Sequence, residues 1–238
     1  MFSIAAHKCL FAAESPEEAS ASQPDFPYPT EADDHCESPR EAYEHILPLL
    51  GHLQKKSPSS FLIYDPYYCD GAVKENLKDL GFPNVYNKKE DCYQVWRSGT
   101  SPTFSSIVTN PPYSSDHIEK LMNYVSSEAF GTRPWFLLMP NWVHKKDYFL
   151  NAVKNISPFY LVPRKRYVYL PPKGFREAKK SDIHKKSSPF VSMWYVWGGT
   201  KSQNEALIRC YLKASGRDGA CDLARSKSAL RDLRRKKR

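Results

Sequence analysis

Short apolar runs alternate with amphipathic stretches between residues 61 and 155. The runs are rich in aromatic and β-branched residues and end at turn residues, which is typical of buried strands. The stretches between them place apolar residues three and four positions apart, which is typical of helices. The pattern predicts strands at FLIYD (61–65), NVYN (84–87), SSIVTN (105–110) and PWFLLMP (134–140), and helices at AVKENLKDLGF (72–82), DHIEKLMNYVSSEAF (116–130) and KKDYFLNAVKN (145–155).

Two longer aromatic-rich segments follow, PFYLVPRKRYVYLP (158–171) and SPFVSMWYVWGG (188–199), joined by a basic loop. Strands that alternate with helices and end in a strand pair predict an α/β fold. Its sheet should be mostly parallel, with an antiparallel strand pair at one edge. Because ligands of such sheets bind at the carboxyl ends of the strands, functional residues are expected directly after the strands.

The two ends of the chain differ in composition from its centre. Residues 1–33 are rich in Pro, Ser, Ala and Glu and show no periodicity. We predict a poorly ordered leader there, with a transit peptide as the alternative. A helix is predicted over 38–53, with Ser38 as its N-cap and Pro39 in the first helical position. The expected organisation is a leader (1–33), one α/β domain (34–212) and a basic tail (213–238).

Composition narrows the class of protein. The 238 residues are 41% hydrophobic, which is enough for one substantial core. No apolar run approaches the ~18–20 residues that span a bilayer, so no membrane partner is expected. The six cysteines include no C-x-x-C pair. Their scatter argues against a zinc site or a disulfide framework and favours a reducing compartment.

Positive charge is concentrated in two regions. The formal net charge is +9, and residues 163–186 and the C-terminal tail are strongly basic. Surfaces of this kind usually bind a polyanion such as a nucleic acid, although a solvated surface is the simpler alternative. The last fourteen residues, RSKSALRDLRRKKR, hold eight basic residues and suggest a nuclear localisation signal or an RNA-binding arm.

The segment Asn110-Pro111-Pro112-Tyr113 directly follows a predicted strand. Neither proline has an N–H, so the backbone cannot continue the strand ladder. The Asn110 side chain and the Pro111 carbonyl then offer two acceptors, which suits an –NH2 group with two hydrogens. Accepting both hydrogens favours a pyramidal nitrogen with a reactive lone pair. Tyr113 supplies a flat surface on which a base can stack. The alternative is that the segment is only a turn.

This segment resembles motif IV of the amino-methyltransferases, which are S-adenosylmethionine-dependent enzymes of Rossmann-like class I fold. The order of motifs is most similar to the gamma-type adenine-N6 methyltransferases. Glu37-Ser38-Pro39 resembles the helix start of that family, and the segment from Asp65 to Gly71 resembles its D-P-A-C-G-x-G loop. The resemblance covers about residues 34–199 in the expected order.

The resemblance implies a set of S-adenosylmethionine-binding residues. Cys69 departs from the family by replacing the middle glycine of the loop. Asn87 stands where the family has an acid for the ribose hydroxyls, and Asp91 resembles the D-x-F/Y residue that touches the cofactor's adenine. The implied cofactor residues are Ser38, Pro39, Asp65, Tyr67, Gly71, Asn87 and Asp91, and the implied catalytic residues are Asn110, Pro111 and Tyr113.

In the resembling enzymes, the hairpin that corresponds to residues 158–199 lies beside the target pocket. Its basic and aromatic residues suit phosphates and unpaired bases. The implied substrate-binding residues are Tyr113, Arg164, Lys165, Arg166, Lys179 and Lys180. His144 and His184 have no partner cluster, so we expect ordinary surface histidines. The mechanism calls for no metal.

The sequence therefore predicts a methyltransferase that acts on adenine N6 in a nucleic acid, with RNA, and rRNA in particular, favoured. An inactive methyltransferase-fold RNA-binding module and a protein glutamine N5-methyltransferase are the alternatives. The chain lacks a separate target-recognition domain, so a protein partner could supply specificity. The basic tail favours a nuclear or nucleolar location, with the cytoplasm as the alternative.

Overall fold

The computed structural model describes residues 36–169, 191–215 and 219–236. Their strands are β1 (Ile63–Tyr64), β2 (Val85–Tyr86), β3 (Ser106–Thr109), β4 (Trp135–Pro140), β5 (Phe159–Pro163), β6 (Ser192–Trp197) and β7 (Cys221–Ala224). Their helices are α1 (Arg40–Gln54), α2 (Ala72–Asp79), α3 (Cys92–Ser98), α4 (His117–Val125), α5 (Asp147–Ala152), α6 (Lys201–Ser215) and α7 (Lys227–Lys236), with a 3-10 turn, η2 (Val143–Lys145), before α5.

All seven strands form one sheet in the order β2-β1-β3-β4-β6-β5-β7. The pairs β1–β2, β1–β3 and β3–β4 are parallel, whereas β4–β6, β5–β6 and β5–β7 are antiparallel. Five strands therefore share one direction, and β6 and β7 oppose it. The predicted α/β fold with a mostly parallel sheet is confirmed, and it is compatible with a Rossmann-like fold.

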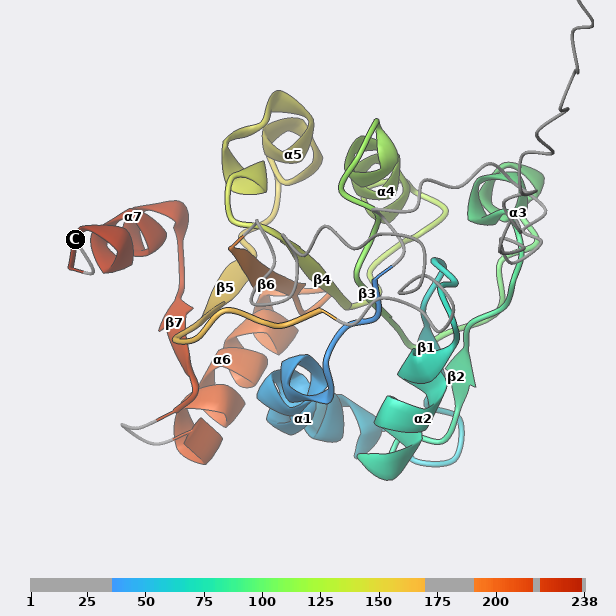
Figure 1. Ribbon diagram of the computed structural model, residues 1–238, viewed down its shortest axis with the longest axis horizontal. Helices are drawn as coiled ribbons and strands as arrows, with labels where there is room; N and C mark the ends of the chain where they lie inside the picture. The colour runs from blue at the N-terminus through green and yellow to red at the C-terminus, as the bar shows by residue number, and fades with distance from the viewer. Residues whose placement is uncertain (1–35, 170–190, 216–218, 237–238) are drawn as a thin grey trace, which may run out of the picture.

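Helices cover both faces of the sheet (Figure 1). One face carries α1, α2 and α6, and the other carries α3, α4, α5 and α7. Strand β4 illustrates why two cores form, since all of its residues are buried. Phe136 and Leu138 point into the core under α1, whereas Trp135, Leu137 and Met139 point into the other core. This alternation follows from the two-residue period of a strand.

The start of α1 differs from the prediction. Pro39 occupies the N-cap position with an extended backbone, and the helix begins at Arg40. Ser38 is buried and its hydroxyl hydrogen bonds Tyr43, so the predicted Ser38 cap is wrong. The serine hydroxyl therefore bonds a side chain of α1 instead of satisfying a free N–H at the helix end.

The predicted domain boundary at residue 212 is also wrong. Helix α6 continues to Ser215, and β7 pairs antiparallel with β5 as the edge strand of the sheet. Helix α7 follows and buries Leu230 against the core. The basic tail therefore contains an ordered part of the fold. The leader, residues 1–33, lies outside the described residues. Among the described helices, none combines the length and the apolar character needed to cross a bilayer.

Candidate functional site

Three polar residues follow three neighbouring parallel strands. Asp65 comes directly after β1, Asn87 after β2 and Asn110 after β3. Because these strands are adjacent and parallel, the three residues lie at the same edge of the sheet, where open α/β sheets bind ligands. The structure thus brings together the residues that the sequence placed at strand ends.

Asp65 is a buried carboxylic acid. Its Oδ1 accepts hydrogen bonds from the Thr109 hydroxyl at 2.6 Å and from the Tyr67 backbone N–H at 3.2 Å. Burial raises the pKa of Asp65 to about 7, the two hydrogen bonds oppose that rise, and nearby Glu37 adds to it. Removing a carboxylate from water disfavours its charged form, so a large fraction of Asp65 side chains stay protonated near neutral pH.

Asn87 is fully buried at the end of β2. Its Nδ2 donates to the backbone oxygens of Asp65, at 3.1 Å, and of Tyr67, at 3.3 Å. Its Oδ1 has no hydrogen-bond partner among the described residues. A buried acceptor without a donor is uncommon and calls for an explanation. A ligand hydroxyl is one group that would satisfy it.

The loop between β1 and α2 is held by Glu37. Its Oε1 accepts from the backbone N–H groups of Asp70, at 2.7 Å, and of Ala72, at 3.3 Å. Gly71 between them has φ +81°, a left-handed conformation that favours glycine. A Cβ there would lie 3.5 Å from the Tyr68 ring. Sequence reasoning missed this role of Glu37, because its partners lie 33 and 35 residues away.

Cys69 of this loop is half-buried. Burial is the main cause that raises the pKa of its thiol, and Glu37 adds to the rise. The thiol is therefore protonated near neutral pH and adds no charge to the loop. Of the two residues predicted beside Glu37, Ser38 hydrogen bonds Tyr43 and Pro39 is the N-cap of α1.

An aromatic cluster stands beside the ends of β1 and β2. The ring of Tyr67 makes edge-on contacts with Tyr93 and Trp96, with centroids 6.2 Å away in each case. The Tyr67 hydroxyl donates to the His117 backbone oxygen at 3.3 Å. Tyr93 stacks on the His117 ring, and its hydroxyl hydrogen bonds that ring. The cluster therefore packs aromatic side chains of α3 and His117 of α4 around Tyr67 at this edge of the sheet.

Asp91 has a structural role in the same region. Its Oδ1 caps α3 by accepting from the backbone N–H groups of Tyr93, at 2.9 Å, and of Gln94, at 3.3 Å. Such a cap satisfies two of the free donors at a helix start. The carboxylate therefore fixes the position of Tyr93, whose ring belongs to the aromatic cluster. Contact of Asp91 with an adenine stays a prediction.

Asn110 is engaged by a residue of its own motif. Its Oδ1 accepts from the Tyr113 hydroxyl at 2.7 Å. That hydroxyl also lies 3.2 Å from the Leu138 backbone oxygen and 3.2 Å from the Tyr169 hydroxyl. The short hydrogen bond at 2.7 Å turns the Asn110 carboxamide toward Tyr113. Pro111 between them is buried.

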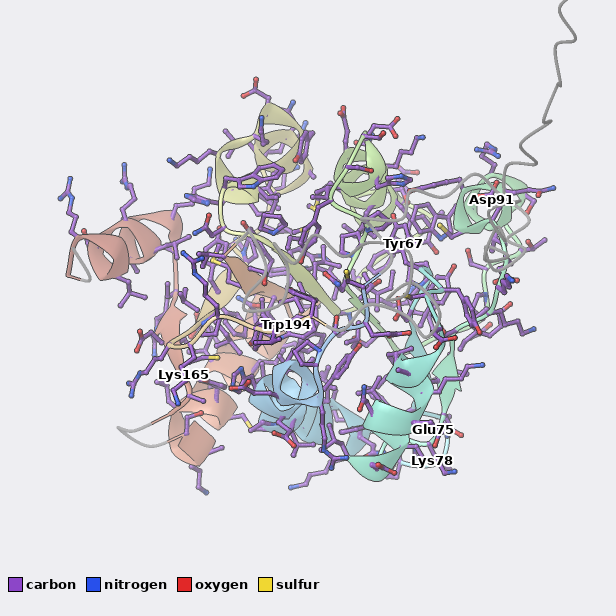
Figure 2. The ribbon with its side chains drawn as sticks, in the orientation of Figure 1. Tyr67, Glu75, Lys78, Asp91, Lys165 and Trp194 are labelled. Atoms are coloured by element: carbon purple, nitrogen blue, oxygen red, sulfur yellow. The ribbon has the colours of Figure 1, made fainter. Side chains whose placement is uncertain are left out.

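The basic residues after β5 follow the same edge of the sheet, but β4 and β6 separate β5 from β3 and Asn110. Arg164, Lys165 and Arg166 are exposed, and Arg164 pairs with Asp222 of β7 at 3.0 Å. Lys165 lies near β7 and α6, at the opposite end of the molecule from Tyr67 and Asp91 (Figure 2). The structure does not bring these cations to Asn110. Lys179 and Lys180 lie outside the described residues.

His144 is buried, so its prediction as a surface residue is wrong. Its Nδ1 lies 2.6 Å from the Asn141 backbone oxygen, and its backbone N–H donates to the Tyr195 hydroxyl at 3.1 Å. The 3-10 turn before α5 places it against β6. His184 lies outside the described residues. No group of three or more metal-ligating side chains occurs in the part of the chain that the structure describes.

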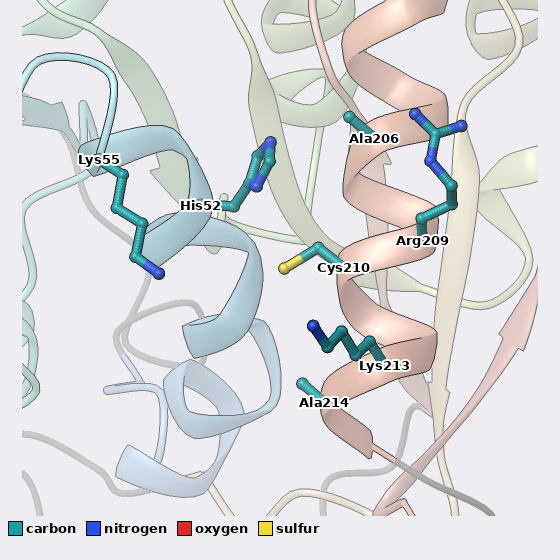
Figure 3. A pocket seen from close by; sticks show the side chains of 7 residues that line it. All are labelled: His52, Lys55, Ala206, Arg209, Cys210, Lys213 and Ala214. Carbon is teal, nitrogen blue, oxygen red and sulfur yellow. The ribbon is translucent and has the colours of Figure 1, made fainter.

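A separate groove of about 620 Å³ lies between α1 and α6. His52 of α1 and Cys210 and Lys213 of α6 face each other across it (Figure 3). Burial and the nearby Lys56 and Lys55 lower the pKa of His52. The groove adjoins the end of α1, whereas Glu37, just before its start, contacts the β1–α2 loop. It is therefore distinct from the site at the strand ends.

No protein-family model matches the chain, and no curated protein matches it either.

Proposed function

We propose that the chain is an S-adenosylmethionine-dependent class I methyltransferase that acts on adenine N6 in a nucleic acid, with RNA, and rRNA in particular, favoured. One observation carries the proposal. The Asn110-Pro111-Pro112-Tyr113 segment leaves β3 beside β1, whose following loop is the family-like segment from Asp65 to Gly71. The antiparallel strand β6 between β4 and β5 supports it, because it completes a hairpin like the one beside the target pocket of the resembling enzymes.

The residues of this edge fit the proposed cofactor. The Asn87 Oδ1 is a buried acceptor in need of a donor, and a ribose hydroxyl is such a donor. Gly71 keeps side-chain atoms out of the loop, and the Glu37 carboxylate beside it suits an ammonium group. Tyr67 and Tyr93 offer planar surfaces for an adenine ring. When bound, S-adenosylmethionine supplies an electrophilic methyl group.

The chain's own residues act on the target amine. The Asn110 Oδ1 and the Pro111 carbonyl accept its two N–H hydrogens, which orients the nitrogen lone pair and favours a pyramidal nitrogen. Two fixed acceptors stabilise the positive charge that develops on that nitrogen. The carboxamide cannot change its protonation state near neutral pH, so it keeps this role over a wide pH range.

Three observations favour the second candidate, an inactive RNA-binding module of the same fold. The acceptor of Asn110 is occupied by Tyr113, and Cys69 and Asn87 replace residues typical of active enzymes. Binding of S-adenosylmethionine and RNA without methyl transfer, tested over a panel of rRNA fragments, would support this candidate. Methyl transfer to adenine would exclude it.

Substitution of Gly71 should weaken cofactor binding. Gly71→Val places a β-branched side chain at φ +81° and against the Tyr68 ring, so the loop must change shape. Strain of this kind costs about 1–3 kcal/mol, so the dissociation constant should rise about tenfold or more. Isothermal titration with S-adenosylhomocysteine measures it. Gly51→Val is the control, because no atom beyond its chain neighbours and the backbone of its own helix lies within 4 Å of a Cβ there. If the intact chain failed to bind the cofactor, the enzyme proposal would be wrong.

Exposed cations after β5 should contribute to nucleic-acid binding. Lys165→Glu combined with Arg166→Glu should weaken binding to a structured RNA. It should also flatten the slope of log K against log salt by about 1.4 or more, because each lost phosphate contact releases fewer counterions. Arg164 is left intact because it pairs with Asp222.

Lys74→Glu with Lys78→Glu on α2 is the matched control for charge, and it should leave the slope unchanged. Figure 2 shows Lys78 on the far side of the molecule from Lys165. A shallow slope shared by all three proteins would instead favour the glutamine methyltransferase, whose substrate is a protein.

A further inference from the structure

The Tyr113 hydroxyl is hydrogen bonded to the Asn110 Oδ1, which is an acceptor that the proposed reaction needs. A phenol has one hydrogen to donate. The Asn110 Oδ1 lies 2.7 Å from the hydroxyl and the Leu138 backbone oxygen lies 3.2 Å from it, so the hydrogen belongs to the shorter contact. Burial is the main cause that raises the pKa of Tyr113 well above its ordinary value. The hydroxyl therefore keeps its proton and stays a donor to Asn110.

Two further hydroxyls hold Tyr113 in this position. The Tyr169 hydroxyl lies 3.2 Å from that of Tyr113 and 2.6 Å from the Ser192 Oγ. Tyr169 comes six residues after the end of β5, and Ser192 is the first residue of β6, opposite Pro140 of β4. A continuous chain of hydrogen bonds therefore runs from Asn110 through Tyr113 and Tyr169 to Ser192 at the start of β6.

We propose that Tyr113 is a latch that occupies the target-amine position, and that Tyr169 and Ser192 are positioning residues that hold the latch shut. The inference rests on the proposed function and adds a regulatory step to that site. The Asn110 oxygen has two lone pairs, and the Tyr113 hydroxyl already holds one of them at 2.7 Å, so an adenine amine that approaches from that side competes with the hydroxyl. Entry of the base requires the Tyr113 hydroxyl to leave Asn110, after which the ring is free to stack on the base.

The position of the latch should affect KM for the target RNA and leave kcat almost unchanged. When only an open fraction of the molecules accepts substrate, the apparent dissociation constant equals the intrinsic one divided by that fraction. Removing one latch hydroxyl should raise the open fraction about threefold to tenfold, as expected for one hydrogen bond. Tyr169→Phe and Ser192→Ala should therefore lower KM for an adenine-bearing RNA by that factor, with the change on KM and not on kcat.

A readout that does not depend on activity tests the latch directly. 3-Fluorotyrosine placed at position 113 reports the environment of the ring by 19F NMR. In Tyr169→Phe and Ser192→Ala the resonance should move toward the position of an exposed tyrosine. Tyr148→Phe removes a hydroxyl from half-buried Tyr148 of α5 and should leave both the resonance and KM unchanged. Addition of the RNA to the intact chain should also move the resonance away from its position in the free chain, because the ring leaves Asn110 and stacks on the base.

The outcomes separate the latch from the proposed function. If the RNA is methylated but neither variant moves the resonance or KM, the latch is wrong and the enzyme proposal stands. If the RNA binds and the 113 resonance of the intact chain does not respond, Tyr113 does not yield to the target and the latch is again wrong. If the chain binds neither S-adenosylhomocysteine nor RNA, the proposed function fails, and the latch loses its role as a gate.

Discussion

Asn110→Ala is expected to lower kcat for adenine methylation by about 10²–10³-fold, while the affinity for S-adenosylmethionine changes little. The carboxamide oxygen at the end of β3 is one of two acceptors proposed for the target amine, and loss of one oriented transition-state partner has a cost of this size. The cofactor groups are provided by the ends of β1 and β2, so they remain in place. Single-turnover rates at saturating RNA, together with isothermal titration, separate the two effects.

Asn123→Ala is the matched control, because that asparagine lies exposed on α4. It should leave the rate within about twofold of the intact chain, as most surface substitutions do. The Asn110 variant also removes the partner of the Tyr113 hydroxyl, so Tyr113 should become more mobile and RNA binding should not weaken. Full activity in Asn110→Ala would mean that another group binds the amine and that the motif assignment is wrong.

Some of the fold could be predicted because local pattern and tertiary context agree. PWFLLMP is apolar throughout, and its strand is buried on both faces as a central strand must be. The helix α2 ends just before Gly81, whose φ of +94° is a left-handed conformation that favours glycine. At these places the period, the length and the stop residue all favour the same element.

Other elements carry weaker signals. Strand β7 has four residues, CDLA, and only its pairing with β5 makes it a strand. The short helix α3 depends on the Asp91 cap, whose Asp-Cys-Tyr-Gln context was interpreted only as a resemblance. Helix α6 had a usable signal, since Leu207, Ile208 and Tyr211 form one apolar face, and this signal was overlooked.

For the candidate site too, some features could be predicted from the sequence and others could not. Asp65, Asn87 and Asn110 were predictable because strand ends of a parallel sheet meet at one edge. The contacts that give them their chemistry were not. Thr109 reaches Asp65 across 44 residues, and Tyr113 reaches Tyr169 across 56. A sequence pattern relates residues that are only a few positions apart. It can therefore predict which residues form a site, but not which of their polar atoms already have a hydrogen-bond partner.

The ionisation of Asp65 should make the stability of the fold depend on pH. Its pKa is about 7 in the folded chain, against an ordinary value of 3.8. Between these values the folded chain holds a proton that the unfolded chain releases, so the free energy of unfolding falls as pH rises. The full difference, about three pKa units, corresponds to at most about 4 kcal/mol. This contribution is complete below about pH 4 and is lost as pH rises through 7.

Asp65→Asn removes this titration and keeps an oxygen that accepts from Thr109 and from the Tyr67 N–H. The free energy of unfolding of the variant, minus that of the intact chain, should therefore rise by about 2–4 kcal/mol between pH 4 and pH 8. Urea unfolding at both pH values measures it, and all other titrating groups cancel in the difference. Asp147→Asn, at an exposed position of α5, is the control and should give a difference close to zero at either pH. A gain by the intact chain as pH rises would mean that the Asp65 carboxylate is stabilised by a positive charge, contrary to its surroundings in this fold.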